Sequence, residues 1–289
     1  MEFLQNLLTF LLDPLTPAFM QRVLLAVLLV GAVCGIIGAY VVTRGMAFLG
    51  DALAHTILPG VAVAYITTSG SPQWVLAGGM VAGVLSAVLI SFLSRGTRLS
   101  EDTSIGIVFA GALALGIGII SRSRSFSTDL QHLLIGNLLA VGSDDLLLML
   151  GIAVIVLIGV ALLYKEFMVI SFDPTFAETL RLPGQLLNTV LLILLALTVV
   201  IALQAVGITL VAAMLVIPAA TARYYVHRLH HLMVLAALMG ALGGALGLYV
   251  SWYGQIAPSA AIVLTLVAGF ILTFLFAPNG GYFRRADAR

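Results

Sequence analysis

Charge is scarce in this sequence of 289 residues. Only 9% of the residues are Asp, Glu, Lys or Arg, whereas 62% are hydrophobic and the mean hydropathy is +1.18. Because soluble domains hold roughly a quarter charged residues, this composition excludes a soluble globular fold. The net charge is only +1, so nothing in the composition indicates nucleic acid as a partner.

Cysteine and the common catalytic motifs are also lacking. The one cysteine, Cys34, excludes an intrachain disulfide and a cysteine metal cluster. The sequence has no GxxxxGK[ST] phosphate-binding loop, no HExxH zinc-protease motif and no GxSxG serine-nucleophile motif. We therefore expect a chain that is not itself an enzyme, does not hydrolyse ATP and holds no permanent cofactor.

Long apolar runs take the place of charge. Several reach the ~20 residues that a helix needs to cross a bilayer, and they do not alternate as the strands of a membrane barrel would. The sequence predicts an all-α, polytopic transmembrane helix bundle of about eight or nine spans. We expect a single transmembrane domain over residues 1–289, with no soluble domain attached. The expected spans are Val23–Val42, Asp51–Thr67, Trp74–Leu93, Thr103–Ile120, Leu146–Tyr164, Leu186–Leu203, Gly207–Ala222, Leu232–Tyr253 and Ala260–Ala277.

Cationic residues predict the orientation of the bundle. Most fall on alternate connections: Arg44, Arg95, Arg98, Lys165, Arg181, Arg223, Arg228, Arg284 and Arg285. The positive-inside rule places these connections and the C-terminus in the cytoplasm. Three arginines, Arg22, Arg122 and Arg124, then fall on the outer side and disagree with the rule.

Two connections carry patterns of their own. The outer connection, Ser121–Asp145, contains an apolar stretch at Leu130–Val141 that is too short to span and predicts a re-entrant or interfacial helix. The inner connection, Lys165–Gln185, contains Asp173-Pro174, a typical helix start with an Asp cap and Pro at the first helical position. It predicts a short cytoplasmic helix that ends near Pro183.

The second span carries the clearest ionisable pair within the membrane. Asp51 and His55 are four residues apart and share one helix face. His55 lies eleven residues beyond Arg44, which at about 1.5 Å per residue is roughly 16 Å from the inner boundary, near the middle of the bilayer. An ionisable group there costs about 3 kcal/mol on insertion scales and marks a functional site by default.

A carboxylate beside an imidazole suits zinc, manganese or ferrous iron. Pro59 supports this interpretation, because it removes the helical partner of the His55 carbonyl and weakens the helix beside the ligands. The alternative is an Asp–His hydrogen bond that only holds helices together, although such contacts more often use Ser, Thr or Asn. Two ligands are half of the usual four, so two copies of the chain facing each other would complete the site.

Other polar residues have less specific interpretations. Asp129 and His132 form a candidate outer site where the ion first binds, or else a solvated helix start. Glu101-Asp102 and Asp144-Asp145 are typical of helix N-termini, where acids complement the dipole. The group His227, His230 and His231 is expected in a solvated cytoplasmic loop, with metal capture as the alternative.

Five motifs in order resemble the membrane permeases of ATP-binding-cassette importers for zinc, manganese and iron, the ABC-3 family. They are TRGMAFLGDALAHTILPGVA (Thr43–Ala62), EDTSIGIVF (Glu101–Phe109), DLQHLLIGNLLAV (Asp129–Val141), FDPTFAETLRLP (Phe172–Pro183) and VGITLVAAMLVIPAATA (Val206–Ala222). The resemblance covers nearly the whole chain. It departs where members often carry Gly, at Arg181, and where a frequent Pro-Thr-Gly appears as Pro258-Ser259-Ala260.

The resemblance implies a homodimeric permease in a bacterial cytoplasmic (inner) membrane. It also implies two cytoplasmic ATPase subunits and an extracytoplasmic metal-binding protein as partners, with Mn²⁺ or Zn²⁺ as the transported ion and Fe²⁺ as a further option. The metal-route residues of the family fall on Asp51 and His55. Its coupling segment to the ATPase falls on residues 172–183, with Phe172, Asp173, Pro174, Ala177 and Glu178 as the contact residues.

Three rival functions follow from the same residues. A secondary carrier or channel would need no ATPase, but it would leave the helix at FDPTFAETL without a role. An intramembrane metal-dependent enzyme would use Asp51 and His55 as acid–base groups or ligands. A permease for a substrate other than a metal has the Asp–His pair as the main argument against it.

Overall fold

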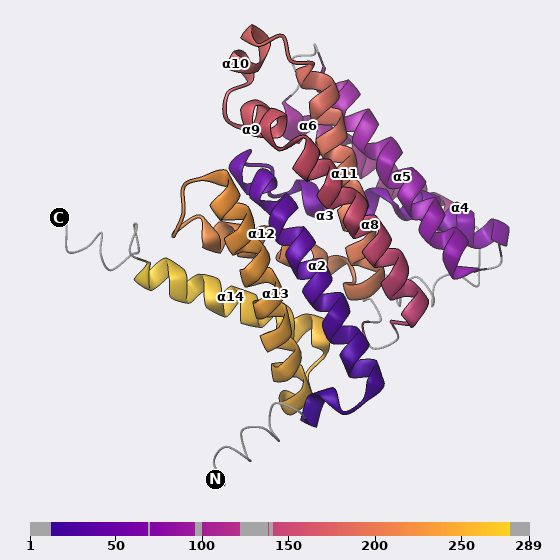
Figure 1. The fold of residues 1–289 in the computed structure, drawn as a ribbon. Coiled ribbons are helices and arrows are strands. Elements are labelled where there is room, and N and C mark those ends of the chain that lie inside the picture. The colour runs from indigo at the N-terminus through magenta and orange to yellow at the C-terminus, as the bar shows by residue number, and fades with distance from the viewer. Residues whose placement is uncertain (1–12, 69, 96–99, 122–137, 139–140, 278–289) are drawn as a thin grey trace.

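The computed structural model describes residues 13–68, 70–95, 100–121, 138 and 141–277, and every regular element in these ranges is a helix. Figure 1 shows a bundle of long helices with a short helical segment, α9 and α10, at one end. The elements are η1 (Asp13–Leu15), α2 (Ala18–Thr43), α3 (Leu49–Thr56), α4 (Leu58–Thr68), α5 (Pro72–Leu93), α6 (Glu101–Ile120), α8 (Ser143–Leu162), α9 (Tyr164–Phe172), α10 (Pro174–Thr179), α11 (Gly184–Val206), α12 (Ile208–Ala222), α13 (Leu229–Gly254) and α14 (Pro258–Phe276).

The expected spans are confirmed as helices. Within the described ranges, eight helical segments are long and apolar enough to cross a bilayer, and α12 is a shorter apolar helix. The second span differs from the expectation because it is divided into α3 and α4 at Ile57. Gly207 alone joins α11 to α12, and its φ of 78° and ψ of 167° lie in a region that only glycine adopts without strain.

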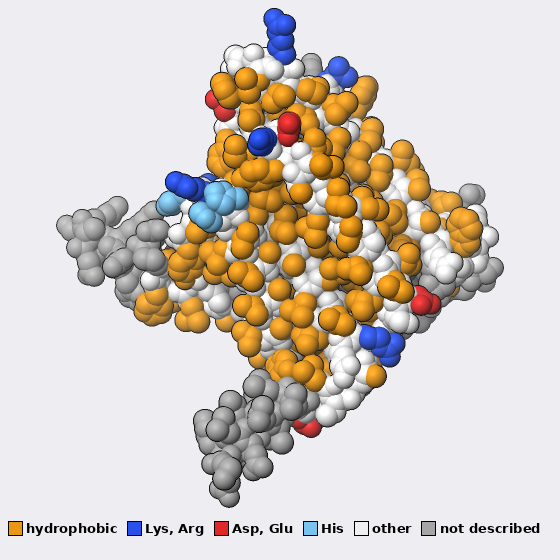
Figure 2. All heavy atoms as spheres, in the orientation of Figure 1, with side chains coloured by type: hydrophobic (Ala, Val, Ile, Leu, Met, Phe, Trp, Pro, Cys, Tyr) orange, Lys and Arg blue, Asp and Glu red, His pale blue; other side chains and the backbone are white. Residues whose placement is uncertain are grey.

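The cationic residues Arg44, Arg95 and Arg223 lie at one end of the bundle, as the charge pattern predicts. Arg44 and Arg95 line one cavity together with Glu178 of the coupling segment. Arg223 donates to the Val42 carbonyl at the end of α2, which places the end of α12 at the same side. Figure 2 shows the face between the two ends covered mainly by hydrophobic side chains, as lipid contact requires.

Close packing of α2 against α13 organises the core. A Cβ built on Gly35 would lie 2.5 Å from the Ala236 backbone, and one built on Gly31 would lie 2.6 Å from the Gly240 backbone. Small residues at four-residue spacing let membrane helices approach this closely. The resulting van der Waals contact stabilises the pair, because hydrophobic burial supplies little driving force within lipid. The contact fixes α2, which leads into the helix that carries the candidate site.

This packing yields a stability prediction. The Gly35→Ala substitution is expected to destabilise the protein by about 1–3 kcal/mol, because the added methyl meets backbone atoms that cannot move aside. The matched control is Gly151→Ala on α8, where a Cβ meets no atom within 4 Å. Thermal unfolding in detergent measures both, and equal stability of the two variants would contradict the close α2–α13 contact.

Candidate functional site

Helix α3 presents its two ionisable residues on one face. Its residues Leu49, Gly50, Ala52, Leu53, Ala54 and Thr56 are buried. Asp51 and His55 are only partly buried and occupy the remaining face. Helix α3 packs on α6, α11 and α12, so the pair is held within the bundle on a short, well-supported helix.

The pair lies close together but without a direct hydrogen bond. His55 Nε2 is 3.9 Å from Asp51 Oδ1, and the side chains are 26% and 41% exposed respectively. His55 Nδ1 is buried and has no hydrogen-bond partner among the described residues. The imidazole packs edge to face on Phe109 of α6, with ring centroids 5.6 Å apart. The imidazole of His55 is therefore positioned by packing, and the Asp51 carboxylate beside it is free to bind a ligand.

The donor set fits a first-row divalent ion but is incomplete in one chain. One carboxylate and one imidazole are ligands for Mn²⁺, Fe²⁺ or Zn²⁺. Across the described ranges, no group of three or more His, Cys, Asp or Glu side chains is placed to hold a metal ion. A stable site therefore needs further ligands, from a second copy of the chain, from water or from residues outside the described ranges.

The helix breaks directly after the pair. α3 ends at Thr56 and α4 begins at Leu58, with Pro59 in its first turn. Pro59 has no N–H to donate to the His55 carbonyl, which instead accepts from the nearby Ile57 N–H. The interrupted helix agrees with the sequence expectation, although the His55 carbonyl is not left fully free.

The other expected site residues have different outcomes. Asp129 and His132 lie outside the described residues, as does most of the stretch Leu130–Val141. Asp145 accepts from the Gly142 N–H, 3.0 Å away, at the start of α8, which agrees with the helix-start interpretation. His230 and His231 lie in the first turn of α13, with their rings 4.0 Å apart, so the expected loop position is wrong for these two residues.

The coupling segment forms the predicted short helix. Asp173 Oδ1 accepts from the Phe176 N–H at 2.9 Å, and Pro174 begins α10. Ala177 is buried, whereas Glu178 is exposed. Three large apolar side chains project from this end of the bundle, each at least half exposed: Phe172, Phe176 and Leu180. An exposed apolar group on a short helix at the end of a membrane bundle is typical of a protein contact surface.

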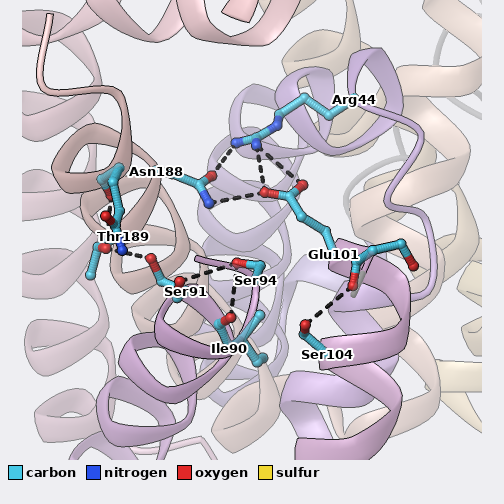
Figure 3. A network of polar contacts seen from close by, with 10 residues as sticks. Arg44, Ile90, Ser91, Ser94, Glu101, Ser104, Asn188 and Thr189 are labelled. Atoms are coloured by element: carbon cyan, nitrogen blue, oxygen red, sulfur yellow. Dashed lines mark hydrogen bonds and ion pairs between the residues drawn. The ribbon is translucent and has the colours of Figure 1, made fainter. Parts of the chain in front are cut away.

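One polar network was not predicted from the sequence. Arg44 Nη2 lies 3.0 Å and 3.2 Å from the two carboxylate oxygens of Glu101, and Arg44 Nη1 donates to Asn188 Oδ1 at 2.6 Å (Figure 3). Asn188 Nδ2 donates back to Glu101 Oε1 at 2.9 Å. The helix-start interpretation of Glu101 is correct but incomplete, because Ser100 caps α6 while Glu101 forms an ion pair. In the sequence, Arg44 and Glu101 belong to two separate motifs, and only the fold shows that they pair.

The comparison with known families identifies the chain. The family model described as "ABC 3 transport family" matches residues 16–277. The chain belongs to the ABC 3 transport family. Its members are permease subunits, so the expectation that the chain is not itself an enzyme is confirmed.

Named relatives extend over nearly the whole chain. The manganese transport system membrane protein MntC of Listeria monocytogenes is 44% identical, over 97% of this chain and 96% of that protein. The chelated iron transport system membrane protein YfeD of Yersinia pestis is 36% identical, over 91% of this chain and 87% of that protein. Among solved structures, PsaBC from Streptococcus pneumoniae in complex with Fab has a TM-score of 0.83 at 34% identity, covering 97% of this chain and 99% of that chain.

The departure at Arg181 yields a second prediction. Arg181 has a φ of 54°, in the left-handed region that glycine adopts freely. We expect Arg181→Gly to leave the thermal stability unchanged or higher, and Arg181→Val to lower it by about 1–3 kcal/mol, since a β-branched residue is strained there. Thermal unfolding of both variants in detergent checks this, and a Val variant as stable as the Gly variant would disprove the positive φ.

Proposed function

We propose that this chain is the membrane-spanning permease subunit of an importer for a divalent transition metal ion, driven by a separate ATPase. The observation that best supports this proposal is the Asp51–His55 pair, which lies on the partly exposed face of α3 in a chain of the ABC 3 transport family. Mn²⁺ is the leading cargo, because several relatives are named as manganese systems, and Fe²⁺ follows from the relative named for chelated iron. Zn²⁺ also has compatible ligand chemistry.

The proposed site lies between two copies of the chain. One copy contributes one carboxylate and one imidazole, and a twofold partner doubles both to give four protein ligands. Helix α6, beside α3, has a surface suited to such a partner. Small residues recur every four positions at Gly106, Ala110, Ala114 and Gly118, and a Cβ at either glycine would meet no atom within 4 Å. Close helix contact in lipid uses such stripes.

The ATPase is proposed to dock at the coupling segment. The chain has no phosphate-binding loop, so hydrolysis requires a partner. The exposed side chains of Phe172, Phe176 and Leu180 form an apolar contact surface at the cytoplasmic end, while the buried Ala177 anchors α10 to the bundle. Two copies of the permease would bind two ATPase subunits. This surface favours the ATP-driven importer over a carrier or channel that works alone.

The proposed cycle needs no covalent chemistry in this chain. An extracytoplasmic metal-binding protein delivers the ion to the outer mouth of the dimer in a bacterial cytoplasmic membrane. Asp51 and His55 replace part of the hydration shell of the ion. ATP binding and hydrolysis in the partner subunits then change access from the outside to the inside. The broken helix after Thr56 places a weak point of the backbone beside the ligands, where a change of shape costs least.

Uptake measurements test the proposed function. We expect Asp51→Ala and His55→Ala to reduce uptake of radioactive Mn²⁺ by more than about 10-fold. Even substitutions of residues that only hydrogen-bond to metal ligands lower metal affinity or activity by roughly 10–100-fold. Cells should express the complete transporter at equal membrane abundance, with Zn²⁺ as competitor. His230→Ala is the matched control and should transport normally. Normal uptake by both Asp51 and His55 variants would refute this metal route.

A further inference from the structure

The network of Arg44, Glu101 and Asn188 joins three helices at the cytoplasmic end. Arg44 caps the C-terminus of α2, Glu101 is the first residue of α6, and Asn188 lies in the second turn of α11 (Figure 3). All three pairs of residues are in contact, so the network is a closed triangle of charge-assisted hydrogen bonds. The Arg44 side chain is 12% exposed and that of Glu101 is 36% exposed, so the ion pair is partly shielded from water.

Each of the three residues is connected to a part of the proposed transport machinery by a segment of hydrogen-bonded backbone. From Arg44, a turn through Gly45 leads into α3, with the Met46 N–H bonded to the Val41 carbonyl and the Leu49 N–H bonded to the Met46 carbonyl. The metal-site residues follow within two turns of helix. The turn is compact and Met46 is buried, so a displacement of Arg44 carries α3 with it.

A second corner connects to the coupling segment. The Leu182 N–H bonds to the Ala177 carbonyl, which folds the end of α10 onto the start of α11. Asn188 follows one turn after Gly184, and its neighbour Thr189 is hydrogen-bonded to Ser91 of α5. A cavity of about 660 Å³ separates the network from α10, and its lining includes Arg44, Glu101, Pro174 and Glu178.

The third residue of the network, Glu101, is connected to His55 through α6. Glu101 begins this helix, and Phe109, two turns further on, packs against the imidazole of His55. Both α3 and α6, which together define the surroundings of His55, are therefore linked to α11 through this network, in addition to the direct packing of α3 on α11.

From this placement we propose that Arg44, Glu101 and Asn188 are positioning residues that transmit movement of the coupling segment to the metal-bearing helix α3. The inference rests on the proposed ATP-driven function and adds the path by which hydrolysis reaches the site. None of the three residues contacts the ion or the ATPase in this account. They hold α2, α6 and α11 as one unit, so that tilting of α11 changes the position of α3.

The test measures ATP hydrolysis and Mn²⁺ uptake together, in proteoliposomes containing the permease, its ATPase and the metal-binding protein. We expect Glu101→Gln, Arg44→Gln and Asn188→Ala to keep ATP hydrolysis near the wild-type rate while uptake per ATP falls by about 10-fold or more, within the range of measured couplings. Asp102→Asn is the matched control, because Asp102 also lies in the first turn of α6 but outside the network, and it should stay fully coupled.

A double variant gives an independent readout. If the contact itself transmits the movement, Arg44→Gln with Glu101→Gln should lose no more coupling than either single change. Unchanged uptake per ATP in the single variants would overturn the proposal, as would equal losses in Asp102→Asn or a parallel loss of hydrolysis and uptake. Failure of the proposed function itself would look different, because the wild-type complex would then import no Mn²⁺.

Discussion

The absence of water around a lipid-embedded backbone is the constraint on which this structure depends. Every backbone N–H and C=O in the hydrocarbon must be paired within the protein, and long helices provide that pairing. Side chains on these helices gain little from hydrophobic burial, so contacts between small residues, such as Gly31 and Gly35 of α2 against α13, hold the bundle together. The same constraint makes ionisable residues costly, so the Arg44–Glu101 ion pair and the neighbouring Asp51 and His55 stand out among the apolar side chains.

Much of the fold could be predicted from the sequence, because hydropathy, length and charge act locally. The apolar runs predict about eight or nine spans with approximate limits, and Asp173-Pro174 predicts the start of α10. The break at Ile57 was foreseen only as a weakening near Pro59. The packing partners could not be predicted, since almost any apolar helix face is compatible with lipid and the choice of α13 as partner for α2 depends on matching glycines far apart in the chain.

The candidate site was predictable only in part, for a related reason. The four-residue spacing of Asp51 and His55 is a local signal, and the structure places both on the free face of α3. The packing of Phe109 on His55 and the pairing of Arg44 with Glu101 join residues more than fifty positions apart, which no local pattern encodes. The proposed roles of Asp129 and His132 stay predictions, because both residues lie outside the described ranges.

We propose that one metal ion binds between two copies of the chain, through Asp51 and His55 of each copy. Pulsed electron paramagnetic resonance of Mn²⁺ bound to the purified permease complex tests this most directly, because it detects nitrogen ligands while a titration gives the stoichiometry. The account predicts one Mn²⁺ for every two chains, with a histidine nitrogen signal that disappears in His55→Ala. One ion per chain, or a nitrogen signal that survives this substitution, would contradict it.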